Sequence, residues 1–331
     1  RILYLLAGPR RGGVDIDSIA TKMNAVVSCF DLERDLSQDL CSDELWIMIA
    51  NDIKNNVYTH ALASPPCGTF SRVRGRNEGP EKLRGPHPPD IYGFKDLAPD
   101  LKAKVRIGTA CALRAHEMAK LMSSIGRPWL IETPDADEDE ANVFNLPEFL
   151  ELRMDDRVKL TKFVQCVYGS VATKPTRLLH TLHLPHLVQH CPHPRVWHRI
   201  PWSGKWLKCA HPPLVGKQLA IRAEQWRPWM RRWQEPEGPW VSKAAAMYPE
   251  ALNVMLVKAC CDEWSTELEQ QAKQSEETKR TADEQVLRQI RLNNRDGRPG
   301  FRFSMRLRGK GTGGVKVKED LPEHLGGMKD V

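Results

Sequence analysis

The residues with the clearest chemical potential are a cysteine and a glutamate, each of which follows an apolar run. Cys67 ends the Pro-stiffened turn Ser64-Pro-Pro-Cys67 after residues 57–63, and Glu132 follows Trp129-Leu-Ile131. The prolines fix the backbone as the chain leaves a predicted strand, so the thiol is presented at a defined place. A thiolate is a nucleophile, and a nearby carboxyl group can assist it. The alternatives are a cysteine that only packs, as most free cysteines do, and a glutamate that only forms a turn.

A glycine-rich loop and an acid stand where nucleotide-binding sheets hold their ligands. Gly8-Pro-Arg-Arg-Gly-Gly13 follows the apolar run 2–7, and its glycines let the backbone approach a ligand closely. Asp31 follows the next apolar run, 25–30. A separation of about twenty residues is the usual one between a phosphate loop and a ribose-binding acid. These residues predict a nucleotide-like cofactor, although Asp31 can also simply end a strand.

Short apolar runs alternate with helical patterns through the first half of the chain, which predicts an α/β fold. We expect strands at 2–7, 25–30, 57–63, 129–132 and 163–168, and helices from Asp15 or Asp17, at 42–55, at 101–122 and at 244–261. In an open parallel sheet the loops after the strands meet in one crevice. The sequence therefore predicts a Rossmann-like sheet with helices on both faces, plus a smaller irregular, loop-rich region.

Composition divides the chain into four parts. Residues 1–177 carry the alternating pattern and form the predicted cofactor-binding and catalytic core. The stretch 178–240 is rich in Pro, His and Trp and is the loop-rich region, and 241–261 is a helix that returns to the core. From 262 to 331 the composition turns to Glu, Gln, Lys and Arg, which predicts a charged helix and then a disordered basic tail. Within the core, residues 72–100 are expected to form a long loop.

The bulk composition permits nucleic acid as a partner without requiring it. There are 49 Lys and Arg against 42 Asp and Glu, a net charge of +7. The nine cysteines are odd in number and irregularly spaced, which favours a reducing, intracellular compartment, the nucleus in a eukaryote. No run approaches the roughly 18 apolar residues of a membrane span. The first residue is Arg1, so we expect a piece of a longer protein, such as a polyprotein.

Taken together, these motifs resemble those of the cytosine-5 DNA methyltransferases over most of residues 1–260. That family has a Phe-x-Gly-x-Gly cofactor loop, a Pro-Cys nucleophile, a Glu-Asn-Val motif and a Gln/Arg-bearing motif in this order. The matching segments are Leu6-Ala-Gly8 with Gly12-Gly13, Pro66-Cys67 with Phe70-Ser71, Ile131-Glu-Thr-Pro134, Gln165-Cys-Val-Tyr-Gly169 with Lys174-Pro-Thr-Arg177, and Tyr248-Pro-Glu-Ala-Leu-Asn253. Pro-Pro-Cys-Gly-Thr-Phe-Ser is most similar to a divergent branch found in phages and mobile elements.

The resemblance implies transfer of a methyl group from S-adenosylmethionine to carbon 5 of cytosine in DNA. Cys67 is implied as the nucleophile, Glu132 as the acid that holds the base, and Arg177 as a third catalytic residue. The implied cofactor contacts are Ala7, Gly8, Gly12, Gly13, Asp31, Asp39 and Pro65, and the implied nucleic-acid contacts are Arg72, Arg74, Arg76 and Lys174. The cytosine must be flipped out of a duplex or supplied single-stranded. The loop-rich region is implied to recognise the target, and we expect a monomer.

Departures from the family pattern leave other functions open. Thr133 replaces an asparagine, the cofactor loop contains Pro9-Arg-Arg11 and lacks its usual aromatic residue, and Arg177 stands where the family often has two arginines. One alternative is a catalytically decayed nucleic-acid-binding domain of a mobile-element polyprotein. Another is an amino-methyltransferase acting on cytosine N4 or adenine N6, whose Ser/Asp-Pro-Pro-aromatic motif differs from Ser64-Pro-Pro-Cys67 at one position. The arginine-rich segment after Cys67 can equally be a solvated loop.

Two Cys-x-His pairs in the loop-rich region have side chains of the types that bind zinc. Cys191 with His193, and Cys209 with His211, offer four ligands. Loose Cys/His patterns are common by accident, so the main expectation is a region without metal. Seven tryptophans between residues 197 and 240 are expected to form the core of this region, with base stacking as the alternative.

Overall fold

The computed structural model describes most of the chain up to residue 295. The described residues are 1–71, 74, 80–137, 139–170, 174–192, 196–199, 206–209 and 248–295. Contacts between Cα atoms divide the chain into two units, Arg1–Gln271 and Ala272–Val331. Within the described ranges, every helix is too short or too polar to cross a lipid bilayer. The sheet and the candidate site lie in the first unit.

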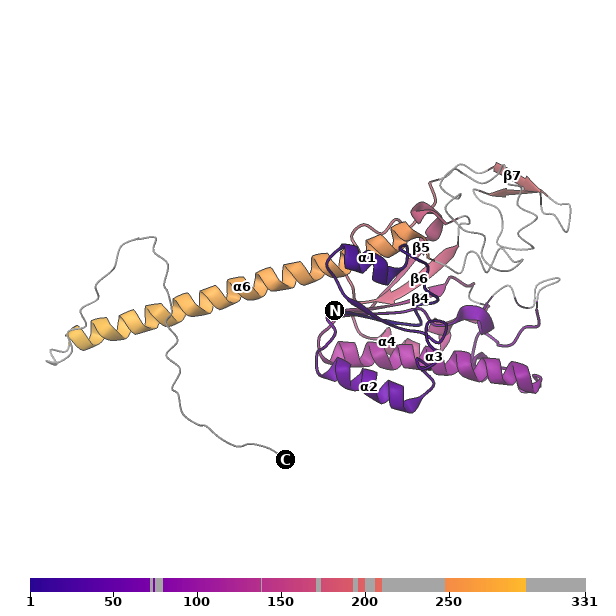
Figure 1. The fold of residues 1–331 in the computed structure, drawn as a ribbon, viewed down its shortest axis with the longest axis horizontal. Coiled ribbons are helices and arrows are strands. Elements are labelled where there is room, and N and C mark those ends of the chain that lie inside the picture. Colours follow the sequence, from indigo (N-terminus) through magenta and orange to yellow (C-terminus); the bar gives the residue numbers. More distant parts are fainter. Residues whose placement is uncertain are drawn as a thin grey trace, which may run out of the picture. The chain divides into compact units, whose positions relative to one another are not determined.

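A six-stranded sheet forms the centre of the first unit (Figure 1). In spatial order its strands are β2 (Val27–Phe30), β1 (Ile2–Leu5), β3 (His60–Ala63), β4 (Trp129–Pro134), β6 (Pro175–His180) and β5 (Lys159–Val164). The first four strands along the chain pair in parallel, whereas β6 runs antiparallel to both of its neighbours. The chain order reverses between β1 and β3, and open α/β sheets bind ligands at the carboxyl ends of strands at such a switch point.

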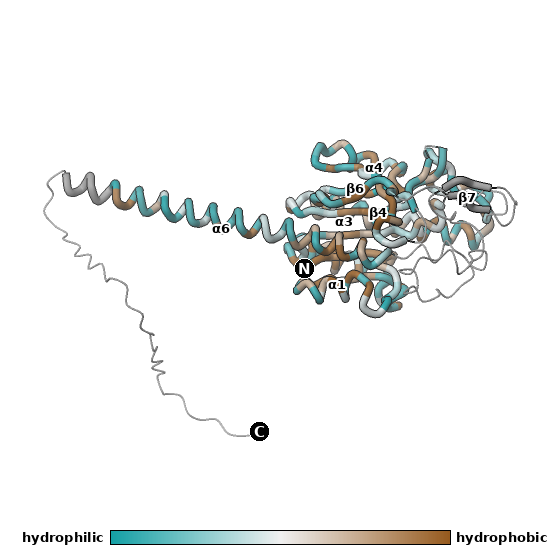
Figure 2. The backbone as a smooth tube through the Cα atoms, turned by 90° about the horizontal axis from the view of Figure 1, so that it is seen from above, coloured by the Kyte–Doolittle hydropathy of each residue, from teal (hydrophilic) through white to brown (hydrophobic). Residues whose placement is uncertain are grey.

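Helices cover both faces of the sheet, as the sequence predicts. In β1, Leu3 and Leu5 are buried on one face and Ile2 and Tyr4 on the other, because successive strand residues point to opposite sides. The first face packs against α2 (Asp43–Lys54), α3 (Pro99–Ser124) and α4 (Pro147–Leu152). The second face packs against α1 (Ile16–Lys22) and the beginning of α6 (Glu250–Arg295). In Figure 2 the strands are brown between these layers, so burial of apolar surface holds the unit together.

The helices begin where the sequence supplies suitable end groups. Ser42 caps α2 by accepting the Leu45 N–H at 3.5 Å. Pro99 begins α3, where its missing N–H matters little because the first N–H groups of a helix have no helical partner. Asp15 occupies the cap position of α1, but its carboxylate accepts the N–H of Arg11 at 3.0 Å instead of one from the helix.

Two elements near the end of the sheet differ from the prediction. The predicted strand at 163–168 begins earlier, at Lys159, and residues Gln165–Tyr168 form a 3-10 turn. Gly169 ends that turn with a φ of 101°, a conformation that favours glycine. β6 continues to His180, so the predicted boundary after residue 177 falls inside a strand of the sheet.

The remaining elements are short, except for α6. Further 3-10 turns occupy Cys67–Thr69, Asp90–Tyr92 and Val143–Asn145. Two strands of the loop-rich region, β7 (Val196–Arg199) and β8 (Trp206–Cys209), form a separate antiparallel pair. α6 runs without a break from Glu250 to Arg295, across the predicted division at residue 262.

Candidate active site

Cys67 lies at the carboxyl end of β3. The pairing of β3 with β1 extends one step further, because the Ser64 N–H donates to the Leu5 carbonyl at 3.1 Å. Pro65 is then buried, Pro66 is exposed, and Cys67 begins a 3-10 turn. Burial raises the pKa of the Cys67 thiol above its ordinary value. The resting side chain is therefore mainly a neutral thiol near neutral pH.

Arg84 anchors the segment that follows Cys67. Arg84 is 1% exposed, and its guanidinium lies 3.8 Å from the centre of the Phe70 ring. Its Nε donates to Thr69 Oγ1 at 3.1 Å. Its two terminal nitrogens donate to the carbonyls of Ile91 and Val105, each at 2.7 Å. Burial lowers the pKa of Arg84 to about 10, so Arg84 is still a cation at neutral pH. It holds the 3-10 turn Cys67–Thr69, which we call the nucleophile turn.

Glu132 is buried in β4, the strand next to β3. It is 6% exposed, and burial raises the pKa of its carboxyl group. Gln165 Nε2 donates to Glu132 Oε1 at 3.4 Å and to Thr176 Oγ1 at 3.1 Å. The other polar atom of that amide, Gln165 Oε1, is buried without a partner among the described residues. Buried polar atoms are normally paired, so this oxygen is an acceptor that the described protein groups leave unused.

Lys174 lies in the same buried region. It is 9% exposed, and its Nζ lies 5.3 Å from the centre of the Tyr248 ring. Burial lowers the pKa of Lys174, and the nearby charges of Glu132 and Cys67 oppose that shift. In return, the Lys174 charge lowers the pKa values of both groups. A residue predicted to contact nucleic acid thus lies beside the thiol and the acid.

Arg177 is engaged at a different place. It belongs to β6, and its guanidinium binds the Asp135 carboxylate and the Ala136 carbonyl. Lys162 also lies 3.5 Å from Asp135. The Lys174-Pro-Thr-Arg177 segment contains two cations. The structure brings Lys174 near Cys67 and Glu132, whereas the resemblance implies a catalytic role for Arg177.

Tyr248 completes the cluster and is absent from the predicted site residues. It is 8% exposed and lies shortly before α6. Its hydroxyl oxygen is 2.7 Å from Ser64 Oγ, and this hydroxyl lowers the pKa of the Glu132 carboxyl group. The sequence offers only a Tyr-Pro pair before a helical pattern, which carries no sign of this role. We name Cys67, Glu132, Lys174 and Tyr248 the thiol–acid cluster.

The glycine-rich loop follows β1, which is the strand beside β3. Gly8, Gly12 and Gly13 have φ angles of 69°, 50° and 93°, which favour glycine. A Cβ atom placed on any of the three would meet no other heavy atom within 4 Å. The space next to these glycines is therefore open, and this loop fits a nucleotide-like cofactor that the backbone must approach closely.

Asp31 braces the glycine-rich loop from the end of β2. Its carboxylate accepts the N–H groups of Gly8 at 2.8 Å and of Glu33 at 2.7 Å. Arg34 adds a bond from its Nε to the Gly8 carbonyl at 2.7 Å. Because each carboxylate oxygen can accept more than one hydrogen bond, Asp31 can brace the loop and still accept a ribose hydroxyl.

Two further predicted cofactor contacts differ in their surroundings. Ala7 is half-buried directly before Gly8 and packs on the face of the sheet that carries α1. Asp39 is exposed, and its Oδ1 accepts the N–H of Cys41 at 2.9 Å. Both residues lie on the loops that follow β1 and β2, as the resemblance implies.

Of the three predicted arginines after Cys67, only Arg74 belongs to the described residues; Arg72 and Arg76 lie outside them. Arg74 Nε donates to the Gly68 carbonyl at 2.6 Å, and its Nη1 donates to the Glu81 carbonyl at 3.0 Å. It also lines a cleft of about 170 Å³ beside the nucleophile turn. Arg74 is therefore placed at the rim of the turn that carries Cys67.

The predicted zinc ligands fall largely outside the described residues. His193 and His211 are not among them, and Cys209 is described only as the last residue of β8. Cys191 is half-buried. In the described part of the chain, no group of three or more His, Cys, Asp and Glu side chains is arranged to hold a metal ion.

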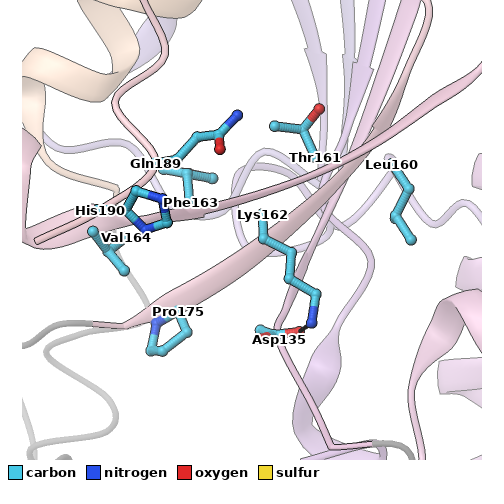
Figure 3. A pocket seen from close by; sticks show the side chains of 9 residues that line it. All are labelled: Asp135, Leu160, Thr161, Lys162, Phe163, Val164, Pro175, Gln189 and His190. Atoms are coloured by element: carbon cyan, nitrogen blue, oxygen red, sulfur yellow. Dashed lines mark ion pairs between the residues drawn. The ribbon is translucent and has the colours of Figure 1, made fainter.

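A larger cavity of about 450 Å³ lies against the β5–β6 hairpin (Figure 3). Its lining residues are Asp135, Leu160, Thr161, Lys162, Phe163, Val164, Pro175, Gln189 and His190. In Figure 3 the Lys162 side chain is directed at Asp135, with which it forms an ion pair. No member of the thiol–acid cluster lines this cavity, so the predicted chemistry lies elsewhere.

Comparison with known proteins finds distant likenesses among solved structures alone. No family model matches the chain, and no curated protein matches it. Three solved chains match, among them the crystal structure of the S. pombe Dnmt2 methyltransferase, with a TM-score of 0.29 and 11% identity. The match covers 58% of this chain and 52% of that chain, so this chain spans about half the length of the structure it matches. The assignment of an α/β fold rests on the sheet described above, in which the loops that carry Cys67 and the glycines follow the neighbouring strands β3 and β1.

Proposed function

We propose that this chain transfers a methyl group from S-adenosylmethionine to carbon 5 of a cytosine in DNA. The observation that carries the proposal is the electrostatic interaction of the half-buried Cys67 thiol with the buried Glu132 and Lys174, at the end of the strand next to the one that carries the glycine-rich loop. Carbon 5 of cytosine becomes a good nucleophile only after a group adds to carbon 6, so this reaction needs a thiolate, an acid and an adjacent methyl donor.

The residues after β1 and β2 fit S-adenosylmethionine. The open space beside Gly8, Gly12 and Gly13 admits a ligand close to the backbone. Asp31 supplies a carboxylate for the ribose hydroxyls at the end of β2. When bound, the cofactor supplies an electrophilic methyl group. Because β1 and β3 are neighbours, its binding loop and Cys67 belong to one crevice.

The thiol–acid cluster supplies the other groups that the reaction needs. The Cys67 thiol gives its proton to solvent water, and Lys174 favours that loss because its charge stabilises the thiolate. The thiolate adds to carbon 6, while Glu132 as a neutral acid protonates N3 as negative charge develops on the ring. After carbon 5 has taken the methyl group, loss of its proton to a base expels Cys67. Glu132 takes back the N3 proton, and the ring is aromatic again.

The base itself needs a polar pocket outside the helix stack. The unpartnered Gln165 Oε1 is an acceptor near Glu132, and the exocyclic amine of cytosine is a matching donor. A base can reach this buried place only when it is flipped or single-stranded. An amino-methyltransferase would need an aromatic side chain at the position of Cys67. It would make no use of the electrostatic interaction of the Cys67 thiol with Glu132 and Lys174.

Covalent trapping tests the proposal directly. The full chain is incubated with S-adenosylmethionine and oligonucleotides, single-stranded or duplex, that contain 5-fluorocytosine. Fluorine cannot leave carbon 5 as a proton does, so the enzyme should remain attached after methylation and should migrate as an adduct on a denaturing gel. Cys67→Ala should abolish the adduct, whereas Cys41→Ser should not. If wild-type protein that binds S-adenosylmethionine in calorimetry forms no adduct, the proposal is wrong.

A further inference from the structure

Tyr248 contacts all four strand-end segments that form the candidate site. Its hydroxyl lies 2.7 Å from Ser64 Oγ, shortly before the nucleophile turn, and lowers the pKa of Glu132. Its ring lies 5.3 Å from Lys174 Nζ. Its carbonyl accepts a bond from Arg11 Nη1, in the glycine-rich loop, at 2.7 Å. One residue, far from these loops in sequence, thus joins them in space.

We propose that Tyr248 is a positioning residue, whose hydroxyl holds Glu132 and the Cys67 turn in a fixed relation. The kinetic consequence of this role rests on the methyl transfer proposed above. The role itself does not, because the contacts join protein groups only. It predicts that removing the hydroxyl changes the ionisation and the placement of Glu132 even when no substrate is present.

The number of available hydrogens fixes the direction of the hydrogen bonds. Tyr248 has one hydroxyl hydrogen. Glu132 in its ionised state can only accept, so in that state, which precedes uptake of the proton that it later gives to N3, Tyr248 is the donor to the carboxylate. Ser64 must then donate to the Tyr248 oxygen at 2.7 Å, and Tyr4 must donate to Ser64 Oγ at 3.0 Å. Burial raises the pKa of the Tyr248 phenol well above its ordinary value, so this donor keeps its hydrogen. The result is a chain of three hydroxyls that all point toward the acid.

The groups around Glu132 give the expected direction in which its pKa changes when the Tyr248 hydroxyl is removed. Burial raises the pKa of Glu132, while Lys174 and the Tyr248 hydroxyl lower it. Tyr248→Phe keeps the ring that faces Lys174 and the carbonyl that binds Arg11, and it removes only the hydroxyl. Loss of a donor to the carboxylate disfavours the charged form, so the pKa of Glu132 should rise.

The first test follows the ionisation of Glu132 without substrate. Full-length protein labelled with carbon-13 at the glutamate carboxyl carbon is titrated by NMR, and Glu132→Gln identifies the Glu132 signal. In Tyr248→Phe the midpoint of this signal should move to higher pH. Replacing Tyr248 with 3,5-difluorotyrosine, a stronger donor of nearly the same shape, should move it to lower pH. These opposite shifts separate a hydrogen bond from a general loosening of the fold, and the downward shift with 3,5-difluorotyrosine can still be measured if Tyr248→Phe folds poorly.

Tyr4→Phe is the matched control, because it removes a buried hydroxyl of the same chain that binds Ser64 but not Glu132. Its Glu132 midpoint should stay close to that of the wild type. The proposal is overturned if the Glu132 midpoint is unchanged in Tyr248→Phe, or if both replacements of Tyr248 shift it in the same direction.

The second test measures methyl transfer. Loss of a hydrogen bond to a charged group should lower kcat about tenfold in Tyr248→Phe. The KM for DNA should change little, because the hydroxyl contacts no substrate. An unchanged kcat would overturn the positioning role. If the wild type transfers no methyl group, the proposed function fails, and the NMR titration still decides the role of Tyr248.

Discussion

Lys174 is the charge on which the reactivity of Cys67 depends most directly. The thiol pKa is raised by burial and by Glu132, and among the charged groups around it Lys174 acts in the opposite direction. The lysine is itself held in an unfavourable place, since burial lowers its own pKa. A buried cation without a role would cost free energy, so this placement supports a part in thiol chemistry.

We predict that Lys174→Met slows alkylation of Cys67. Removing the cation raises the pKa of the thiol, so a smaller fraction is thiolate at a given pH. The rate of reaction with iodoacetamide at pH 8 should fall about tenfold, measured by mass spectrometry of the Cys67 peptide. Lys174→Arg, which keeps the charge, should retain most of the rate.

Lys162→Met provides the control for this prediction. Lys162 is an exposed lysine paired with Asp135, outside the thiol–acid cluster. Its removal should leave the alkylation rate of Cys67 unchanged. An equal loss in both variants would show that overall charge, and not the position of Lys174, sets the reactivity of the thiol.

At the scale of elements, Arg84 connects the nucleophile turn to α3 and to the turn at Asp90–Tyr92. Gly108 in α3 packs so closely that a Cβ atom there would lie 2.7 Å from Thr69 Oγ1 and 3.3 Å from Arg84 Nη2. The glycine is thus required by the close approach of the helix to the turn. The position of Cys67 is set by three segments that are distant in sequence.

We predict that Arg84→Met destabilises the first unit by about 3 kcal/mol, because it leaves several buried oxygens without donors. Urea unfolding followed by circular dichroism measures the loss. Arg106→Met, at an exposed position of α3, should change the free energy of unfolding by no more than roughly 0.5 kcal/mol. A small effect of Arg84→Met would mean that water replaces the guanidinium, and Arg84 would then not be an anchor.

A second prediction at this scale concerns His60, in the central strand β3. It is 2% exposed, its Nδ1 lies 3.0 Å from Thr59 Oγ1, and its Nε2 lies 3.9 Å from a Glu263 oxygen in α6. Burial lowers the pKa of His60 to about 4. The ring is therefore neutral at pH 7, and the contact with Glu263 is no ion pair there.

The pH dependence of stability follows from this shift. In the unfolded chain a histidine has a pKa of about 6.5, so the unfolded state binds a proton below that pH while folded His60 does not until about pH 4. Stability contributed by His60 is fully present above pH 6.5 and falls by up to about 3 kcal/mol between pH 6.5 and 4. Chemical unfolding at pH 4.5 and 7 should show a smaller difference in His60→Phe than in the wild type. His87→Phe, at an exposed position, should behave as the wild type; equal pH dependence in all three proteins would contradict the prediction.

The sequence predicts the parallel half of the sheet well and its antiparallel end poorly, for a physical reason. β1, β2 and β3 lie within largely apolar runs that are bounded by glycine, acid and proline, and β1 and β3 are buried along their whole length, as expected of strands covered on both faces. Residues 165–168 are also largely apolar, but Gly169 takes a positive φ and turns the chain there. The placement of β6 between β4 and β5 depends on pairing with distant residues, which local patterns do not encode.

The same distinction holds for the candidate site. Cys67, Glu132 and the glycine loop are recognisable because each follows a strand and has a chemically distinctive type. Tyr248 and Lys174 carry no such mark, since their importance comes from burial beside groups that are far away in the chain. Sequence alone therefore leaves out Tyr248, and it assigns Lys174 to nucleic-acid contact and not to the thiol.

For the whole molecule, the first turns of α6 belong to the fold of the first unit, which ends at Gln271. Leu252, Leu256 and Val257 are almost fully buried against the sheet face that carries α1. We predict that a chain ending at Gln271 keeps the thermal unfolding temperature of the full chain, because these contacts remain.

A chain ending at residue 247 should unfold far more easily. It loses these three aliphatic side chains, worth roughly 5 kcal/mol, together with Tyr248. That is a large part of the total stability of a domain. Differential scanning calorimetry of the two truncated chains makes the comparison, and similar transitions in both would show that α6 is dispensable for the fold.

The position of Tyr248 in the chain also bears on how the protein is made. Tyr248 leaves the ribosome 184 residues after Ser64, its hydrogen-bonding partner. At the usual rate of translation this interval lasts roughly 10 to 40 s. During that time β1 and β3 can pair, but the hydroxyl that joins Ser64 to Glu132 has not yet been synthesised. The nascent chain therefore carries Cys67 without its finished surroundings, and it is during synthesis that this thiol is most open to oxidation.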